Sequence, residues 1–320
     1  MENKVIPHYY PEGELLYRTE NRISLANAEG IRRAMRNGTV LEAPAISANT
    51  ALSLEIDLGP FAHGIMPLEE CVLLSKDEKF KEISVIGRVG KAVAFKVIGE
   101  EKAKDGLPLF ILSRRAAQLE CKHNYIDCLE AGDIIDCKVT HTERYGAFCD
   151  VGCGCFALLP VDSISVSRLP HPRERFSPGD CIRAVVKYRD SAGRLFITRR
   201  ELCGTWEENA ALFSVGQTVT GIVRSIEDYG AFIELTPNLA GLAEPCDTLE
   251  EGQYAAVYIK SLIPEKMKVK LVVIDKCPAI NTPRPLPSFP IENTEHIDRW
   301  RYSPEVCKKI VETLFDGKVL

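Results

Sequence analysis

A short stretch near the middle of the chain occurs twice, and this repeat constrains the fold more than any other feature. Residues 144–152 read Arg-Tyr-Gly-Ala-Phe-Cys-Asp-Val-Gly, and 84 positions later residues 228–235 read Asp-Tyr-Gly-Ala-Phe-Ile-Glu-Leu. Gly132 and Gly216 precede the two copies at the same distance. A pattern that stays in register over such a length is typical of a duplicated folding unit.

The alternation of side chains predicts which residues of the stretch face the interior. Ala147, Cys149 and Val151 point to one side of the expected strand, and Phe148 and Asp150 point to the other. Small apolar residues suit the inside of a small barrel, so we expect Phe148 on the outer face, with Tyr145 beside it at the bend. Two exposed rings could stack nucleobases at about 1–3 kcal/mol per base without sequence preference. The alternative is that both rings only fill the barrel.

The totals describe an ordinary folded protein. The chain has 320 residues, which suggests two or three domains, with 45% hydrophobic and 27% charged residues. It contains no run of about 18 apolar residues, and its first residues lack the apolar stretch of a signal peptide. We therefore expect a cytoplasmic protein with no membrane association, whose twelve cysteines stay reduced.

The residue patterns of metal sites and catalytic centres are absent from the sequence. Cys149, Cys153 and Cys155 form the densest cysteine group, but no suitably spaced fourth ligand accompanies them. The sequence contains no phosphate-binding loop, no His-Glu-x-x-His and no Gly-x-Ser-x-Gly. We expect no metal, no cofactor and no catalytic residue, which means that the chain is not an enzyme.

The charge is unevenly distributed along the chain. The net charge is −5, yet residues 131–201 carry 11 Lys and Arg against 9 Asp and Glu. Residues 214–275 carry 5 Lys and Arg against 9 Asp and Glu. If phosphates are bound, the middle unit should bind them best.

A third, degenerate copy precedes the other two. Residues 54–59 match the end of the repeated stretch, but Leu52 and Glu55 stand where the middle unit has Tyr145 and Phe148. This copy keeps the scaffold pattern and lacks the rings. We expect it to bind nucleic acid poorly, or to act as a spacer or a protein-contact module.

The middle unit should contain five strands, at about residues 133–141, 146–151, 155–159, 180–189 and 194–200. A long connection with basic residues at 168, 173 and 175 separates the third strand from the fourth, and could be either a contact loop or a solvated surface loop.

The segments outside the copies carry helix signals. We expect a helix from Ser24, its cap, to Asn37, with Gly38 as its end. A helical connector is predicted over residues 201–213. Five prolines between positions 278 and 290 predict a stiff, extended linker. An amphipathic helix capped by Ser303 is predicted over 303–315, docked on its own chain or on a partner.

These features together resemble the S1 RNA-binding motif, an OB-fold barrel. The resemblance comes from the five short strands, the Tyr-Gly-Ala-Phe bend, a Gly-Leu-x-Pro strand and a closing strand that ends in Ser/Thr-Arg-Arg. The resemblance is good over residues 130–275 and moderate over residues 39–118. The chain is similar to short S1-like ribosomal proteins of Gram-positive bacteria. It implies an all-β chain of three tandem five-stranded OB-fold barrels, with helical linkers and short helical N- and C-terminal extensions. The expected parts are 1–38, 39–118, 130–201, 214–276 and 277–320.

The resemblance also implies a function and a set of binding residues. The family binds single-stranded RNA, so the chain is expected to bind RNA or mRNA without catalysis, in translation and near the small ribosomal subunit. The residues carried over are Tyr145, Phe148, Arg144, Lys187, Arg189, Arg199, Tyr229, Phe232, Lys260 and Lys270. Many S1 motifs have a histidine on the third strand, where this chain has Pro67, Pro160 and Glu244, and Glu244 should weaken binding by the last unit. The alternative function is an OB-fold scaffold for proteins without strong RNA binding.

Overall fold

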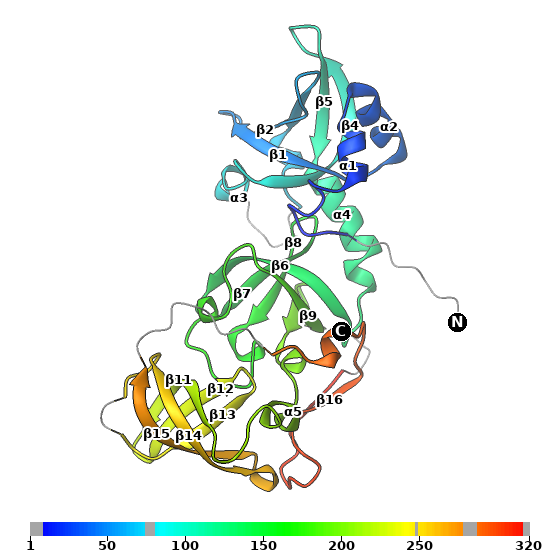
Figure 1. Ribbon diagram of the computed structural model, residues 1–320. Helices are drawn as coiled ribbons and strands as arrows, with labels where there is room; N and C mark the ends of the chain where they lie inside the picture. Colours follow the sequence, from blue (N-terminus) through cyan, green and yellow to red (C-terminus); the bar gives the residue numbers. More distant parts are fainter. Residues whose placement is uncertain (1–8, 74–80, 247–248, 278–286, 316–320) are drawn as a thin grey trace. The chain divides into compact units, whose positions relative to one another are not determined.

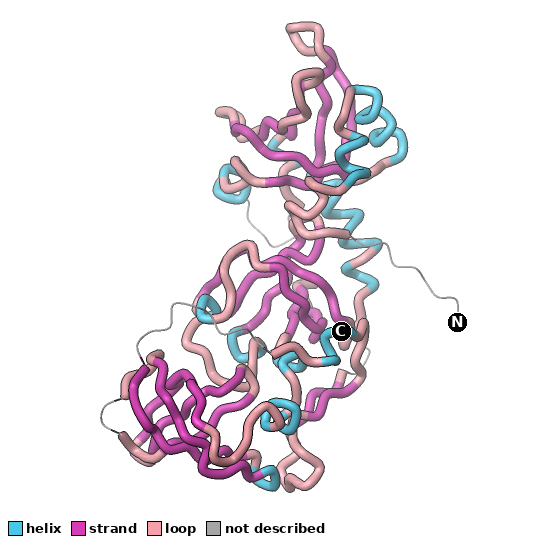
Figure 2. The backbone as a smooth tube through the Cα atoms, viewed as in Figure 1, coloured by secondary structure: helices cyan, strands magenta, loops and turns pink. Residues whose placement is uncertain are grey.

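Three closed barrels of five strands each contain nearly all the strands of the chain (Figure 1). The computed structural model describes residues 9–73, 81–246, 249–277 and 287–315. Figure 2 shows that strands dominate and that the helices are short segments. The predicted all-β class and the three tandem five-stranded barrels are confirmed.

The three barrels share one topology, in which the third strand runs parallel to the fifth. In the first barrel the strand order is β1-β2-β3-β5-β4, and β3 and β5 form the parallel pair. Its strands are β1 Leu41–Ala48, β2 Leu54–Ile56, β3 His63–Met66, β4 Ala92–Lys102 and β5 Pro108–Ser113. Buried apolar side chains such as Phe95 and Phe110 fill its interior.

The middle and last barrels have the same interior pattern. The middle strands are β6 Ile134–Glu143, β7 Gly146–Gly152, β8 Cys155–Pro160, β9 Cys181–Arg189 and β10 Leu195–Thr198. The last strands are β11 Thr218–Glu227, β12 Gly230–Thr236, β13 Leu239–Ala243, β14 Tyr254–Ile263 and β15 Lys268–Cys277. Ala147, Cys149 and Val151 are fully buried, as the alternation along β7 predicts.

The chain divides into two compact units, and each is described by itself. The first comprises residues 1–129 together with 150–157, and the second comprises 130–149 together with 158–320. The tip of the β7–β8 hairpin therefore belongs to the first unit.

The helices begin and end where capping side chains and left-handed residues allow. The helix predicted over 24–37 begins later, as α2 Ala28–Asn37, and a separate short helix, α1 Thr19–Ser24, precedes it. The predicted cap is wrong, because Asn27 Oδ1, and not Ser24, accepts a hydrogen bond from Gly30 N at 2.9 Å. Gly38 ends α2 in the left-handed conformation, as predicted.

The remaining helical segments are short. The helix α4, Arg114–Asn124, follows the first barrel, and α5, Trp206–Ala210, lies before the last one. Thr205 and Glu208 form a capping box at the start of α5. A single helical turn α3, Ile83–Ile86, and seven 3₁₀ segments complete the described helical residues: η1 Leu68–Glu70, η2 Ile126–Cys128, η3 Val161–Ser163, η4 Pro172–Glu174, η5 Arg200–Cys203, η6 Pro264–Lys266 and η7 Pro290–Asn293.

The predicted C-terminal helix over 303–315 is wrong. Two short strands, β16 Arg299–Arg301 and β17 Glu312–Leu314, pair antiparallel there. Ser303 Oγ accepts from Val311 N at 3.1 Å across this pair and does not cap a helix. The physical reason is tertiary: Trp300 and Tyr302 are buried against the last barrel, and Val306 and Ile310 of the supposed apolar face are each 61% exposed. The segment does pack on its own chain, through these other residues.

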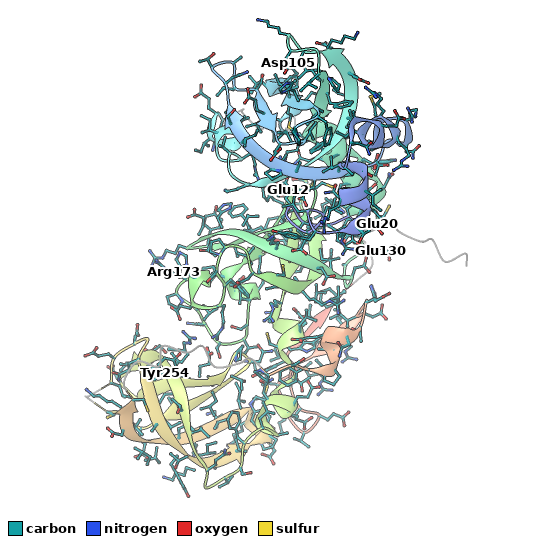
Figure 3. All side chains as sticks on the ribbon, turned by 45° about the horizontal axis from the view of Figure 1, so that its top comes forward. Glu12, Glu20, Asp105, Glu130, Arg173 and Tyr254 are labelled. Carbon is teal, nitrogen blue, oxygen red and sulfur yellow. The ribbon has the colours of Figure 1, made fainter. Side chains whose placement is uncertain are left out.

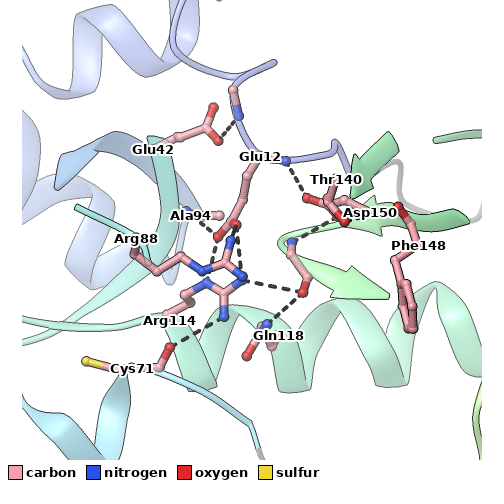
Figure 4. Close-up of polar contacts among 12 residues, drawn as sticks. Glu12, Glu42, Cys71, Arg88, Ala94, Arg114, Gln118, Thr140, Phe148 and Asp150 are labelled. Carbon is pink, nitrogen blue, oxygen red and sulfur yellow. Dashed lines mark hydrogen bonds and ion pairs between the residues drawn. The ribbon is translucent and has the colours of Figure 1, made fainter. Parts of the chain in front are cut away.

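A buried cluster of charged groups stabilises the first unit (Figure 4). Glu12 accepts hydrogen bonds from Arg114 Nε at 2.7 Å and from Arg88 Nη1 at 3.1 Å. Asp150, at the hairpin tip, accepts from Glu12 N at 2.8 Å. Burial opposes ionisation of Glu12, but Arg114 and Arg88 hold its pKa below the ordinary value. Burial, together with the neighbouring Glu12 carboxylate, raises the pKa of Asp150.

A glycine is required where this cluster meets the hairpin. Gly154 has φ +74°, and a Cβ built on it would lie 1.8 Å from Arg114 Nη2. Gly154 N also donates to Asp150 Oδ1 at 3.0 Å. Any larger side chain at 154 would therefore displace the arginine.

An imidazole in the C-terminal segment makes the stability of the second unit depend on pH. His296 Nδ1 lies 2.7 Å from Asp133 Oδ1, and Nε2 lies 3.3 Å from Asp298 Oδ1. Burial lowers the pKa of His296, but the bonds to the two aspartates raise it more, so the net shift is upward. The contribution to stability is therefore complete below the ordinary value of about 6.5 and is lost as pH rises through the raised folded pKa.

We expect the unfolding temperature of the second unit to be higher at pH 6 than at pH 8.5, and His296→Gln to reduce this difference. Calorimetry across this pH range measures it. The control is His63→Gln, because His63 pairs with Asp105 in the first unit. An unchanged pH dependence in His296→Gln would rule out this imidazole as its source.

Candidate nucleic-acid interface

Tyr145 and Phe148 form an aromatic pair on the outside of the middle barrel. Tyr145 stands at the turn before β7 and is 58% exposed, and Phe148 is half-buried on β7. Their ring centroids are 6.0 Å apart with an interplanar angle of 85°, so the edge of one ring faces the other. Val161 N donates to Tyr145 O at 3.0 Å and holds the bend. With small residues filling the interior, neither ring is needed to fill the barrel.

The last barrel repeats the pair with nearly the same geometry. Tyr229 is 63% exposed, and its ring centroid lies 6.2 Å from that of Phe232 at 88°. Gly230, between them, has φ +142°, and a Cβ there would lie 2.1 Å from Ala243 O. The turn geometry that presents the two rings therefore requires glycine.

Strand pairing places five outward positions side by side around each barrel, and we call this set the cross-strand row. In the last barrel the pairing runs Ser225 to Phe232, Phe232 to Leu242, Leu242 to Lys270, and Lys270 to Ser261. The 84-residue offset places His141, Phe148 and Leu158 at the same positions in the middle barrel. Phe196 precedes the buried Ile197 of β10 as Lys270 precedes the buried Leu271 of β15, and β10 lies next to β8. Phe196 and its partner Tyr188 therefore complete the row. In the first barrel it is Ser47, Glu55, Ile65, Ile111 and Gly99.

The cross-strand row of the middle barrel contains four rings in two stacked pairs. His141 stacks on Phe148 with centroids 4.3 Å apart and planes 9° apart. Tyr188 stacks on Phe196 with centroids 4.6 Å apart and planes 11° apart. The middle barrel is thus the most aromatic of the three along this row.

Sequence reasoning missed His141, Tyr188 and Phe196. The family resemblance directs attention to the third strand, where Pro160 stands, whereas this histidine reaches the aromatic pair from the first strand, β6. The two-residue turn Arg144-Tyr145 could have revealed His141. If Glu143 pairs with Gly146 across this turn, His141 lies opposite Phe148.

The first barrel has no ring in its row. Glu55 takes the place of Phe148 and accepts a hydrogen bond from Ser47 Oγ at 2.6 Å. Leu52, in the place of Tyr145, adopts φ 58°, an unusual conformation for leucine. A carboxylate in this position would repel a phosphate backbone.

The predicted basic residues of the middle barrel lie in different surroundings. Arg144 is exposed at the turn, and Lys187 is half-buried with Nζ 3.4 Å from Ser163 Oγ. Arg189 is half-buried near the end of β9. Arg199 is turned toward its own barrel, with its guanidinium carbon 5.8 Å from the ring centroid of Phe176 and Nη1 3.5 Å from Cys203 Sγ.

The last barrel offers less positive charge at matching positions. Asp228 replaces Arg144 at the turn. Lys260 is paired with Glu244 at 3.5 Å, and Lys270 is exposed in the cross-strand row. These substitutions favour the middle barrel as the stronger site for a polyanion.

The long connection of the middle barrel has both buried and exposed basic groups. Arg168 and Arg173 are exposed, and Figure 3 shows Arg173 pointing away from the barrel. Arg175 is buried and pairs with Glu234, which also accepts from Arg224 Nε at 2.7 Å. Arg175 therefore holds the connection to the last barrel and cannot serve as a contact on a free loop.

Closed five-stranded barrels with this topology belong to the OB-fold class. Within it, residues 129–200 match the model of the S1 RNA binding domain family. The middle barrel is an S1 RNA-binding domain, and the chain is an S1-motif protein that resembles small ribosomal subunit protein bS1.

Curated relatives carry this name. Small ribosomal subunit protein bS1 of Staphylococcus epidermidis is 30% identical over 188 residues, covering 53% of this chain and 48% of the relative. The bS1 protein of Rhizobium meliloti is 26% identical over 195 residues, which cover 55% of this chain and 34% of the relative. This chain therefore spans half or less of the length of these relatives.

One solved structure extends over more of the chain. It is a multidomain protein with nucleic acid binding domains from Streptococcus pneumoniae, 14% identical, with a TM-score of 0.24, and the match covers 74% of this chain and 73% of that protein. A score this low adds nothing to the assignment.

Among the residues that the structure describes, every helix is too short or too polar to span a bilayer. Within the same residues, no group of three or more His, Cys, Asp or Glu side chains is placed to hold a metal ion.

Proposed function

We propose that this chain is a non-enzymatic, cytoplasmic protein that binds single-stranded RNA, with its main site on the middle barrel. Tyr145 and Phe148 stack on unpaired bases, and Arg144, Lys187, Arg189 and Arg199 supply positive charge. The last barrel contributes a weaker site through Tyr229, Phe232, Lys260 and Lys270. Its RNA is an mRNA or another translation-associated RNA, and its setting is the small ribosomal subunit.

The observation that carries this proposal is the exposed Tyr145–Phe148 pair, which lies within the S1 RNA-binding domain. Exposed rings offer flat faces to any base, and nearby cations attract the backbone. Tandem sites on one chain gain affinity because binding at one raises the effective concentration at the next. The bS1 name of the relatives supports the ribosomal setting.

Direct binding to single-stranded and duplex RNA tests the proposal. We expect the chain to bind a labelled, unstructured oligonucleotide in fluorescence anisotropy, and to bind the same sequence far more weakly once annealed, because paired bases cannot stack on protein rings. Three or four phosphates neutralised by the middle barrel predict a log–log salt slope of about −2 to −3. Equal affinity for both forms, or a salt-independent Kd, would contradict it.

The alternative function is a scaffold that contacts proteins through its barrels. The ring-free cross-strand row of the first barrel and the net charge of −5 favour it. A partner captured by the chain that stays bound after nuclease treatment would support the scaffold. A partner lost with the RNA would support the RNA-binding proposal.

A further inference from the structure

The Tyr188–Phe196 pair is a surface feature without a necessary structural role. Tyr188 is 42% exposed and Phe196 is half-buried, while their neighbours Val186 and Ile197 fill the barrel interior. The two rings stand on adjacent strands, β9 and β10, which pair directly at these residues. Their parallel planes at 4.6 Å repeat the arrangement of His141 on Phe148 in the same row.

The other two barrels close without rings at these positions. The last barrel has Ser261 and Lys270 there, and the first has Gly99 and Ile111. A requirement of the barrel architecture would demand rings in all three. The pair therefore belongs to something that the middle barrel alone does.

The position of the pair points to the ligand. It occupies the same cross-strand row as Phe148, with only the β8 residue Leu158 between the two stacked pairs. Two strand spacings separate Phe148 from Phe196, about 10 Å. A base stacked squarely on Phe148 therefore does not cover the Tyr188–Phe196 pair, which stays open to a second base.

We propose that Tyr188 and Phe196 form a second base-stacking subsite for single-stranded RNA, so that the strand crosses the middle barrel along the row from β6 to β9. Lys187 and Arg189 precede and follow Tyr188 on β9 and add positive charge to this strand. The inference rests on the proposed RNA-binding function and extends it from one subsite to two. The competing explanation is that the pair only stabilises the β9–β10 hairpin through cross-strand packing.

A tryptophan reporter tests the subsite without removing its ring. The two native tryptophans, Trp206 and Trp300, are buried, so Tyr188→Trp adds the exposed one. We expect this variant to bind an unstructured RNA and to lose emission on binding, because a base stacks on the indole. Unquenched emission at saturating RNA would overturn the subsite.

Loss of the rings should weaken binding only for RNA long enough to reach them. We expect Tyr188→Leu with Phe196→Leu to raise the Kd for a 12-nucleotide RNA roughly 5- to 150-fold, the effect of one lost stacking contact. The Kd for a much shorter RNA, confined to the Phe148 subsite, should change little. The matched control is Tyr258→Leu, which removes a tyrosine of similar exposure (37%) outside the row.

The outcomes separate this inference from the function on which it rests. If Tyr145→Ala with Phe148→Ala weakens binding and the leucine pair does not, the second subsite is wrong and the RNA-binding proposal stands. If the wild type does not bind RNA, or if the tryptophan reporter responds only to a protein partner, both proposals are overturned. Circular dichroism verifies the fold of the leucine variant, and the reporter result stands even if that variant unfolds.

Discussion

Replacing Tyr145 and Phe148 together with alanine is expected to weaken binding of an unstructured RNA by at least about 30-fold, because two stacking contacts of about 1–3 kcal/mol each are lost. Tyr145 is largely exposed and Phe148 is half-buried outside a core of small residues, so the barrel should still close. Fluorescence anisotropy measures the affinity, and circular dichroism verifies the fold.

The matched control is the same double substitution in the last barrel, Tyr229→Ala with Phe232→Ala. The ring geometry there is nearly identical, so any difference in effect reports the surroundings. We expect a smaller loss, because Asp228 replaces Arg144 and Glu244 neutralises Lys260. Equal losses of affinity would mean that the surrounding charge does not matter. If neither variant loses affinity, the proposal that these rings stack on bases is wrong.

Arg114→Leu should destabilise the first unit by about 3–5 kcal/mol, the usual cost of removing one partner of a buried ion pair. Arg114 is 1% exposed and forms two hydrogen bonds to Glu12, at 2.7 and 3.0 Å. Without it, the Glu12 carboxylate remains buried near Asp150. Urea unfolding followed by far-UV circular dichroism measures the change, since both tryptophans belong to the second unit.

The neighbouring residue supplies the control. Arg115 pairs with Glu70 at 2.8 Å, but its side chain is half exposed. Arg115→Leu should cost less than about 1 kcal/mol, since water screens and replaces a surface ion pair. Similar costs for the two substitutions would show that burial of the pair does not control stability. In Glu12→Leu with Arg114→Leu, part of the loss should be recovered, because the Glu12 carboxylate no longer stays buried without Arg114, and only the bond from the partly exposed Arg88 is lost as well.

Local patterns predicted the strands well and the C-terminal segment badly. The five strands of the middle barrel lie close to their predicted positions because alternation and turn residues act over a few neighbours. The 303–315 segment carries a helical pattern, but burial of Trp300 and Tyr302 against the last barrel forces an extended pair. Burial of two large rings outweighs weak helix propensity.

The roles of charged residues were the hardest to predict. The sequence places Arg175 in a loop that could contact RNA, but the structure buries its side chain against Glu234. The alternation along β7 predicts that Asp150 faces outward, and in the structure the N-terminal segment covers it at Glu12. Both partners are distant in the sequence, by 59 and 138 positions. No local pattern encodes such pairs.

The sequence by itself determined the repeat, the small interior of the barrels and the Tyr-Gly-Ala-Phe turn that presents Tyr145 and Phe148, because a period of two residues and a glycine turn are properties of neighbouring residues. Only the tertiary structure decided that Phe196 and Tyr188 share one row with His141 and Phe148. Barrel closure brings β6, β7, β10 and β9 to one level, and the register of pairing, which depends on the whole barrel, selects which side chains meet.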